Sequence, residues 1–142
     1  MEEQEYRHMY EEEEQHWWYV GMRSIVLSLL PPASVPSNSL VLDAGCGSGY
    51  NMGWLKRNYR SAITGIDLSA RALDFCRRRG EHVLAQADSA LLPFSGSRYD
   101  LVVSFDMLTE MKNESVRAEA LREFLRILKP GGRLLAAGPR DE

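Results

Sequence analysis

Cysteine and histidine are scarce in this chain, which has two cysteines and three histidines among 142 residues. Cys46 lies within a glycine-rich stretch and Cys76 within a predicted helix, so a disulfide framework is not expected. No cluster of residues has the spacing of metal ligands, and we expect no metal. We interpret Cys46 as a small residue whose backbone matters, rather than as a nucleophile.

Long apolar runs are also missing. No stretch approaches the roughly 20 apolar residues that cross a bilayer, and the N-terminal segment is acidic where a signal peptide is basic. With 44% hydrophobic and 26% charged residues, the chain has the composition of an ordinary globular domain. We therefore expect a cytoplasmic protein with no membrane partner.

Positive charge is not in excess, because 17 Lys and Arg residues face 20 Asp and Glu residues. Domains that bind the phosphate backbone usually carry a basic face, so we expect no nucleic acid partner. The acids are concentrated in residues 1–16, which contain seven of them and one arginine. We interpret this segment as a solvated acidic helix; the alternative is a helix that lies against a mildly basic body.

The most informative stretch is residues 41–49, where an apolar run ends in Asp43 and glycines follow at 45, 47 and 49. Such glycines allow positive φ and a close approach of a ligand, so the pattern predicts a strand, a tight turn and a helix start. A dinucleotide site needs a third glycine where this chain has Tyr50 or Met52. Asp43 would repel a pyrophosphate and favours a ligand with an ammonium group, such as S-adenosylmethionine.

Strand and helix signals alternate through the rest of the chain, which predicts a parallel sheet with right-handed crossovers. Two helices are expected over residues 3–14 and 16–30, before a linker at 31–38 that is rich in proline and serine. Ser69 is the expected N-cap of a later helix and Gly80 its stop. We expect strands at 40–43, 62–67, 82–86, 100–105 and 133–137, helices at 50–58, 70–79 and 114–128, and a loop at 89–98.

The stretch V-L-D-A-G-C-G-S-G resembles the first motif of class I S-adenosylmethionine-dependent methyltransferases, of the type 11 kind. Further motifs follow in order: G-I-D-L-S at residues 65–69 is similar to the second-strand motif, residues 87–89 to the adenine-side motif, and residues 125–135 to the last turn and strand. The resemblance covers about residues 39–139. It implies residues 1–38 as a helical lid and linker, and residues 39–142 as the cofactor-binding core.

The fold implied by this resemblance is α/β, a Rossmann-like three-layer sandwich with a mainly parallel five-stranded sheet in the order 3-2-1-4-5. We expect this sheet without the family's usual strands 6 and 7, because the residues given end directly after the expected fifth strand. That arrangement leaves the fifth strand at an edge with unpaired backbone groups. We expect the N-terminal helices or another molecule, such as a second copy in a homodimer, to cover this edge.

The resemblance also implies which residues hold S-adenosylmethionine. The backbone of the glycine turn and Asp43 take the methionine portion, and Asp67 accepts the ribose hydroxyls. Asp88 takes the adenine amino group. As structural alternatives, Asp67 is an acid at a helix start and Asp88 a turn residue. The full expected set is Asp43, Ala44, Gly45, Cys46, Gly47, Gly49, Asp67, Leu68, Asp88, Ser89 and Phe105.

Residues 16–23, H-W-W-Y-V-G-M-R, resemble a segment that precedes the core in one branch of the family. Neighbouring helix residues point about 100° apart, so one or two of these rings should project over the strand ends as a lid; alternatively, the tryptophans anchor the N-terminal helices. His16 is a candidate general base or a helix cap. Arg23 is a candidate partner of an anion or of a surface acid. The expected acceptor and lid set is Trp17, Trp18, Tyr19, Arg23 and Asp106.

A second catalytic candidate follows the fourth strand. The family often has D-x-L-x-H there, and this chain has Glu110 in place of the histidine. This difference favours a cationic or amine acceptor.

The sequence as a whole predicts methyl transfer from S-adenosylmethionine to a small-molecule acceptor by in-line attack on the sulfonium methyl, with S-adenosylhomocysteine as the product. A catalytic base is optional, because the cofactor carries its own electrophile. One alternative is a non-catalytic or partner-dependent cofactor-binding module. Another is an NAD-dependent oxidoreductase, which the glycine spacing disfavours.

Overall fold

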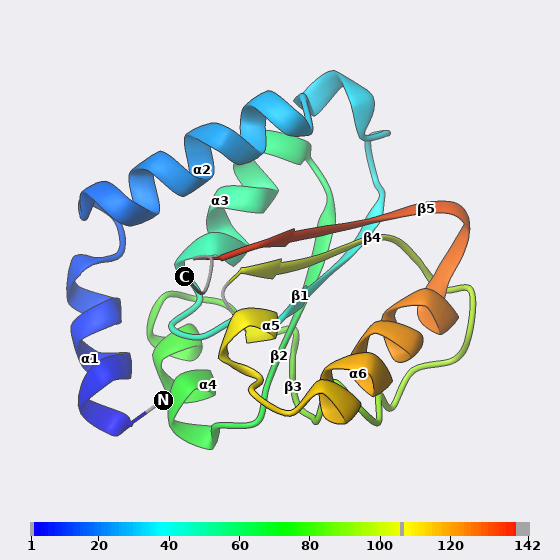
Figure 1. Ribbon diagram of the computed structural model, residues 1–142. Coiled ribbons are helices and arrows are strands. Elements are labelled where there is room, and N and C mark those ends of the chain that lie inside the picture. Colours follow the sequence, from blue (N-terminus) through cyan, green and yellow to red (C-terminus); the bar gives the residue numbers. More distant parts are fainter. Residues whose placement is uncertain (1, 106, 139–142) are drawn as a thin grey trace.

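The computed structural model describes residues 2–105 and 107–138. At its centre lies a five-stranded sheet in the order β3-β2-β1-β4-β5, in which every neighbouring pair of strands is parallel. Helices cover both faces of the sheet (Figure 1). The fold class and the strand order are therefore confirmed. The strands are β1 (Leu40–Ala44), β2 (Ala62–Asp67), β3 (Leu84–Gln86), β4 (Tyr99–Phe105) and β5 (Leu128–Ala137).

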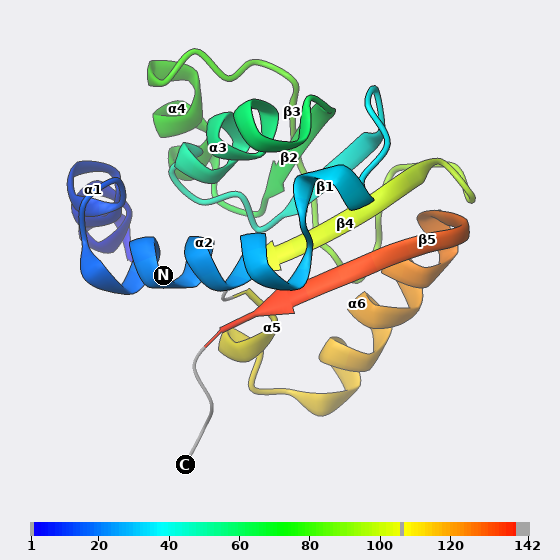
Figure 2. The ribbon, with the colours of Figure 1, turned by 90° about the horizontal axis from the view of Figure 1, so that it is seen from above.

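The helices form the two outer layers of the sandwich (Figures 1 and 2). Within the described residues, no helix combines the length and apolar character needed to span a membrane. The helices are α1 (Glu3–Glu12), α2 (Trp17–Leu29), α3 (Tyr50–Tyr59), α4 (Ala70–Arg78), α5 (Met107–Glu110) and α6 (Glu114–Ile127), with a short 3-10 helix at Pro32–Ser34.

Alternating side chains of the strands supply the two halves of the core. Val41 of β1 belongs to a buried cluster that includes residues of α2, α3 and α4, among them Val26 and Leu55. Leu42, the next residue, belongs to a second cluster with Phe124 of α6. Strands covered on both faces are expected to be continuously apolar, and β1 fits this rule until Asp43.

Helix ends follow the local signals in the sequence. The Ser69 hydroxyl accepts a hydrogen bond from the Ala72 amide at 3.1 Å and so caps α4. Gly80, just past that helix, has a φ of +87°, which a residue with a Cβ rarely adopts. These two expectations are confirmed. The N-terminal helices end earlier than expected, at Glu12 and Leu29.

The largest difference from the expected elements lies at the start of β5. The sequence predicted a helix to residue 128 and a strand only from residue 133, but β5 begins at Leu128, directly after α6. Leu128 pairs with Tyr99 and Arg133 with Leu101, so residues 129–132 form an irregularity inside the strand. Gly131 lies within it at a φ of +82°. The predicted turn is therefore a bulge-like interruption of β5.

β5 lies at one edge of the sheet and, among the described residues, pairs only with β4. The N-terminal helices do not pair with this edge. Instead α2 packs over the adjoining face, where Leu27 joins the same cluster as Leu135. The Arg133 guanidinium adds a link to the linker, since it donates to the Ser34 carbonyl at 2.5 Å.

Candidate functional site

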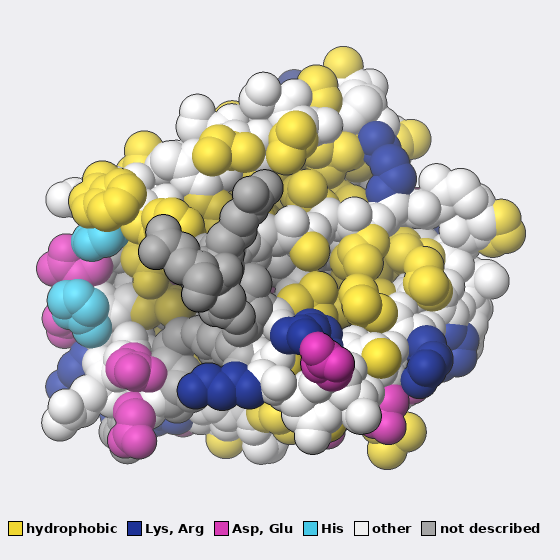
Figure 3. Space-filling view, viewed as in Figure 1, with side chains coloured by type: hydrophobic (Ala, Val, Ile, Leu, Met, Phe, Trp, Pro, Cys, Tyr) yellow, Lys and Arg dark blue, Asp and Glu magenta, His cyan; other side chains and the backbone are white. Residues whose placement is uncertain are grey.

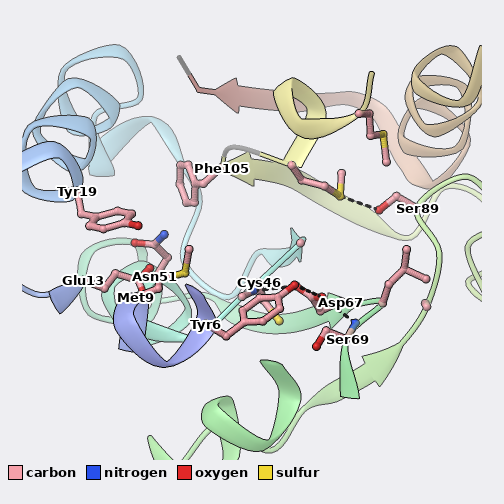
Figure 4. Close-up of a pocket in the computed structure, with 16 residues that line it drawn as sticks. Tyr6, Met9, Glu13, Tyr19, Cys46, Asn51, Asp67, Ser69, Ser89 and Phe105 are labelled. Atoms are coloured by element: carbon pink, nitrogen blue, oxygen red, sulfur yellow. Dashed lines mark hydrogen bonds between the residues drawn. The ribbon is translucent and has the colours of Figure 1, made fainter. Parts of the chain in front are cut away.

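A cavity of about 390 Å³ opens at the carboxyl ends of β1, β2 and β4, beneath α1 (Figure 4). It brings together many of the residues expected to bind the cofactor or cover the site: Tyr19, Gly45, Cys46, Gly47, Asp67, Leu68, Ser89 and Phe105. Its wall also contains residues that the sequence analysis did not assign to a site: Tyr6, Met9, Glu13, Asn51, Met107 and Met111.

The glycine turn between β1 and α3 forms the floor of this cavity. Gly45 has a φ of +78°, and a Cβ built there would lie 2.8 Å from the Met107 Cβ. Gly49 has a φ of +89°, and a Cβ there would lie 2.9 Å from the Cys76 Sγ. Both positions therefore need glycine, because a side chain would be strained at this positive φ and its Cβ would collide with a neighbouring residue. Ala44, before the turn, is fully buried in the core beside α6.

Cys46 and Cys76 pack against each other beneath the turn, with their sulfur atoms 3.7 Å apart. The hydrogen bond with Cys76, together with burial, raises the pKa of the Cys46 thiol well above its ordinary value. A thiol held neutral is a poor nucleophile. The geometry therefore favours a packing role for Cys46, which matches its interpretation from the sequence.

Asp67, at the end of β2, is a buried carboxylate held by backbone amides. Its Oδ2 accepts from the Gly47 amide at 3.0 Å, and its Oδ1 accepts from the Ser69 amide at 2.9 Å. The Tyr6 hydroxyl of α1 donates to Oδ1 at 3.3 Å. The carboxylate is thus fixed in orientation and faces the cavity, as an acceptor of two ribose hydroxyls must.

Asp43 lies in β1 behind the turn, is 1% exposed and does not line the cavity. Among the described residues, neither of its carboxyl oxygens has a hydrogen-bond partner. Burial, and then the nearby carboxylates of Glu13 and Asp67, raise its pKa to about 8. Buried polar atoms without partners are rare in proteins, so these two carboxyl oxygens call for a hydrogen-bond donor. An ammonium group fits this position in charge and in hydrogen bonding.

Helix α1 forms the lid of the cavity. Tyr6, Met9 and Glu13 follow one another at spacings of three and four residues, so they lie on one side of the helix and all three line the cavity. The Tyr10 ring packs against Phe75 of α4 at 5.0 Å between centroids. From the sequence we expect residues 1–38 to form a helical lid and linker, and we interpret residues 1–16 as a solvated acidic helix, with a helix that lies against the body as the alternative. The apolar spacing of Tyr6, Met9 and Tyr10 was the available signal for a docked helix.

The segment at residues 16–23 contributes one residue to the cavity, Tyr19. Trp17 is 76% exposed. Acidic side chains gather at the left of the molecule, near α1 (Figure 3). Trp17 and Trp18 do not line the cavity. The Nδ1 of His16 accepts from the Trp18 amide at 3.3 Å, so His16 caps α2. His16 does not line the cavity either.

Arg23 is buried and ties three elements together. Its guanidinium donates to the Glu13 carbonyl at 2.8 Å and to the Asn51 side-chain oxygen at 3.4 Å. It also lies 4.5 Å from the centroid of the Tyr50 ring. Burial lowers the pKa of Arg23. The guanidinium thus fixes the end of α1 against α3 and is not a residue of the cavity wall.

The other end of the cavity holds the residues expected near the adenine. Ser89 and Leu68 line it. Asp88 does not line it, is exposed, and accepts from the Ala90 amide at 2.9 Å, as a turn residue does. Asp106 lies outside the described residues. Glu110 belongs to α5, and its side chain lies outside the described part of the chain. No group of three potential metal ligands is present in residues 2–105 and 107–138.

A parallel sheet in this order, with a three-glycine turn and a buried acid at the next strand end, defines a nucleoside-cofactor-binding domain of the class I methyltransferase type. The chain belongs to the methyltransferase domain family, whose model matches residues 42–136. This family membership confirms the resemblance of the core to class I methyltransferases, while the assignment of residues 16–23 to one branch of the family stays a prediction.

Two curated relatives are each 36% identical to this chain. One is the tRNA (carboxymethyluridine(34)-5-O)-methyltransferase of Arabidopsis thaliana, with 102 aligned residues that cover 72% of this chain and 24% of that protein. The other is the fatty-acid O-methyltransferase of Mycolicibacterium smegmatis, where the match covers 70% of this chain and 37% of that protein. The chain thus spans well under half the length of either relative.

Solved structures show the same fold. A chain from the complex between the Haloferax volcanii Trm112 methyltransferase activator and a methyltransferase superposes with a TM-score of 0.76 at 26% identity. The superposition covers 93% of this chain and 55% of that chain.

These comparisons overturn the partner prediction. The scarcity of positive charge led us to exclude a nucleic acid, but relatives from Arabidopsis thaliana, Xenopus tropicalis and mouse are named as tRNA methyltransferases. The solved neighbour is a complex with a different protein, the Trm112 activator. The exclusion of nucleic acid is therefore wrong, while the expectation that a second copy or another molecule covers the edge of β5 stays a prediction.

Proposed function

We propose that this domain catalyses S-adenosylmethionine-dependent methylation of a carboxylate oxygen on tRNA. The observation that carries this proposal is the chemistry shared by the two relatives at 36% identity. One name describes O-methylation of a carboxymethyluridine and the other O-methylation of a fatty acid, and both compounds contain a carboxyl group. The tRNA names of the relatives from Xenopus tropicalis and mouse favour tRNA as the molecule that presents it.

The described residues fit the cofactor in three places. Asp67 is oriented to accept the ribose hydroxyls, Asp43 offers two unpartnered oxygens to an ammonium group, and the turn at residues 45–49 brings backbone close to the ligand. S-adenosylmethionine, when bound, supplies a methyl group on a positively charged sulfur. Helix α1 covers this end of the cavity and limits the access of water, so we assign the lid to α1 and Tyr19.

A carboxylate acceptor changes what the protein must do. Its pKa of about 4 leaves it ionised at neutral pH, so no base has to remove a proton before transfer. The remaining task is to hold the oxygen in line with the methyl group. Phe105, Met107 and Met111 line the cavity wall. Their apolar side chains strengthen charge interactions between acceptor and cofactor.

The experiment is a transfer assay with methyl-labelled S-adenosylmethionine. The acceptors are tRNA that carries carboxymethyluridine, the same tRNA without the carboxymethyl group, and a free fatty acid. Each reaction is run with the chain alone and with added Trm112 protein, because a solved neighbour is a complex with that activator. Asp67→Asn serves as the variant impaired in cofactor binding.

We expect label only on the carboxymethylated tRNA, and we expect mild alkali to release it as methanol, because methyl esters hydrolyse under those conditions. Label that resists alkali would point to another acceptor atom. Label on the fatty acid alone would refute tRNA as the acceptor.

A further inference from the structure

Helix α1 ends in a carboxylate that reaches the cofactor cavity. Glu13, the residue that caps α1, is only 2% exposed and lines the cavity, while its neighbours Glu12 and Glu14 are exposed. Its side chain accepts a hydrogen bond from the Ser48 hydroxyl in the glycine turn. Glu13 is one of four consecutive glutamates at residues 11–14, and burying its carboxylate costs free energy, because ionised carboxylates are stabilised by water. A specific role for Glu13 would explain this placement.

We propose that Glu13 binds the ammonium group of the methionine portion of S-adenosylmethionine, and that Asp43, behind the glycine turn, acts on the same group through its charge. The proposal rests on the proposed function only for the identity of the cofactor. It makes the N-terminal helix a source of direct ligand contacts, beyond the lid and linker that the sequence predicts for residues 1–38.

The position of Glu13 along α1 supports this role. The Tyr6 hydroxyl donates to Asp67, so the start of α1 lies at the ribose end of the cavity. Two helical turns later, Glu13 contacts Ser48 of the glycine turn. In Figure 4, Glu13 lies near Asn51 and Tyr19, while Ser69 and Ser89 lie at the opposite end. The cavity-facing side of α1 therefore runs from the ribose acid to the methionine end.

The charges around the methionine end also favour a cation. Glu13, Asp43 and Asp67 are all buried, and they lie close enough for their charges to interact. Two arginines lie close by: Arg23 donates to the Glu13 carbonyl and Arg79 to the Ser48 carbonyl. Neither is among the residues that line the cavity, so the charged side chains that face the ligand there are acidic. Asp43 has two buried oxygens without a hydrogen-bond donor, which points to a donor from the ligand. An ammonium group supplies both the positive charge and the donors.

A purely structural role for Glu13 is the competing explanation, in which its bond to Ser48 only anchors α1. The two roles differ in their dependence on the ligand. Loss of an anchor would lower the affinity for every ligand that is covered by α1. Loss of an ammonium partner would lower the affinity only for ligands that carry the ammonium group.

The test compares two ligands by calorimetry. S-adenosylhomocysteine has the amino-acid portion, and 5′-methylthioadenosine shares its adenine, ribose and sulfur but lacks that portion. For Glu13→Gln we expect the affinity for S-adenosylhomocysteine to fall about tenfold or more, as for loss of a charged hydrogen bond. The affinity for 5′-methylthioadenosine should change less than about twofold. Glu14→Gln, at the exposed neighbouring position, is the matched control and should change neither.

Glu13→Asp keeps the charge and should retain more affinity than Glu13→Gln. If the glutamine variant does not fold, Ser48→Ala removes the hydroxyl that orients Glu13 and is measured with the same two ligands. An equal loss for both ligands would make Glu13 an anchor and overturn the proposal, and so would no loss for either. Both outcomes are independent of the transfer assay, so they leave the acceptor question to that experiment.

Discussion

The buried Asp43 makes the stability of this domain depend on pH. In the folded chain its pKa is about 8, against an ordinary value of 3.8. Between these two values the folded state keeps the proton and the unfolded state loses it. Because the unfolded state then binds fewer protons, the free energy of unfolding falls as pH rises, by about 1.4 kcal/mol per pH unit from this one group.

Asp43→Asn replaces the carboxyl with a neutral group of similar shape that does not titrate. From the pKa of about 8, the ionisation cost that asparagine removes is about 1.5 kcal/mol at pH 5 and about 4 kcal/mol at pH 7. Any packing cost of the amide itself is the same at both pH values. The variant should therefore gain about 2.5 kcal/mol relative to the wild type between pH 5 and pH 7, while it loses affinity for S-adenosylhomocysteine.

The assay is urea unfolding followed by circular dichroism at both pH values, without ligand. Asp74→Asn is the control, because Asp74 is exposed on α4 in an ion pair with Arg77. Its stability difference from the wild type should stay within about 0.5 kcal/mol. A difference between Asp43→Asn and wild type that is the same at pH 5 and pH 7 would refute a raised pKa for Asp43.

Three further outcomes follow from the same site. Binding of S-adenosylhomocysteine at pH 7 should release a proton, because an ammonium partner lowers the raised pKa of Asp43; calorimetry in buffers of different ionisation enthalpy measures this, and no release would contradict it. Asp67→Asn should weaken the same ligand by about 1–3 kcal/mol through lost ribose bonds, and an unchanged calorimetric affinity would remove Asp67 from the ribose site. Tyr6→Phe should raise the affinity for S-adenosylhomocysteine by up to about fivefold. The Asp67 carboxylate has about four acceptor positions, and two backbone amides and the Tyr6 hydroxyl fill three of them. One position remains for two ribose hydroxyls, and loss of the Tyr6 hydroxyl frees the second. A weaker calorimetric affinity would mean that Tyr6 supports the ribose instead.

The strand, turn and helix around residues 41–49 could be predicted from sequence because their causes are local. Gly45 and Gly49 are required by their own φ values and by near contacts, and Asp43 lies next to the last residue of β1. The family resemblance then gave the strand order. Local signals also fixed the cap of α4 at Ser69.

The role of α1 could not be predicted in the same way, because it depends on contacts far apart in sequence. Tyr6 and Asp67 are separated by 61 residues, and Glu13 and Ser48 by 35. Nothing local distinguishes Glu13 from the three acids beside it. Only the docking of α1 on α4, through Tyr10 and Phe75, decides which of the four faces the cavity.

The same docking explains why net charge was a poor guide to the partner. The count of −3 sums the whole chain, although residues 1–16 hold seven of the 20 acids. Phosphate groups respond to charge within a screening length of about 8–10 Å, so acids on α1 do not cancel cations elsewhere. Arg57 and Arg60, at the end of α3, are exposed. A total charge near zero is therefore compatible with a locally basic surface, and only the placement of the charges can argue for or against a nucleic acid.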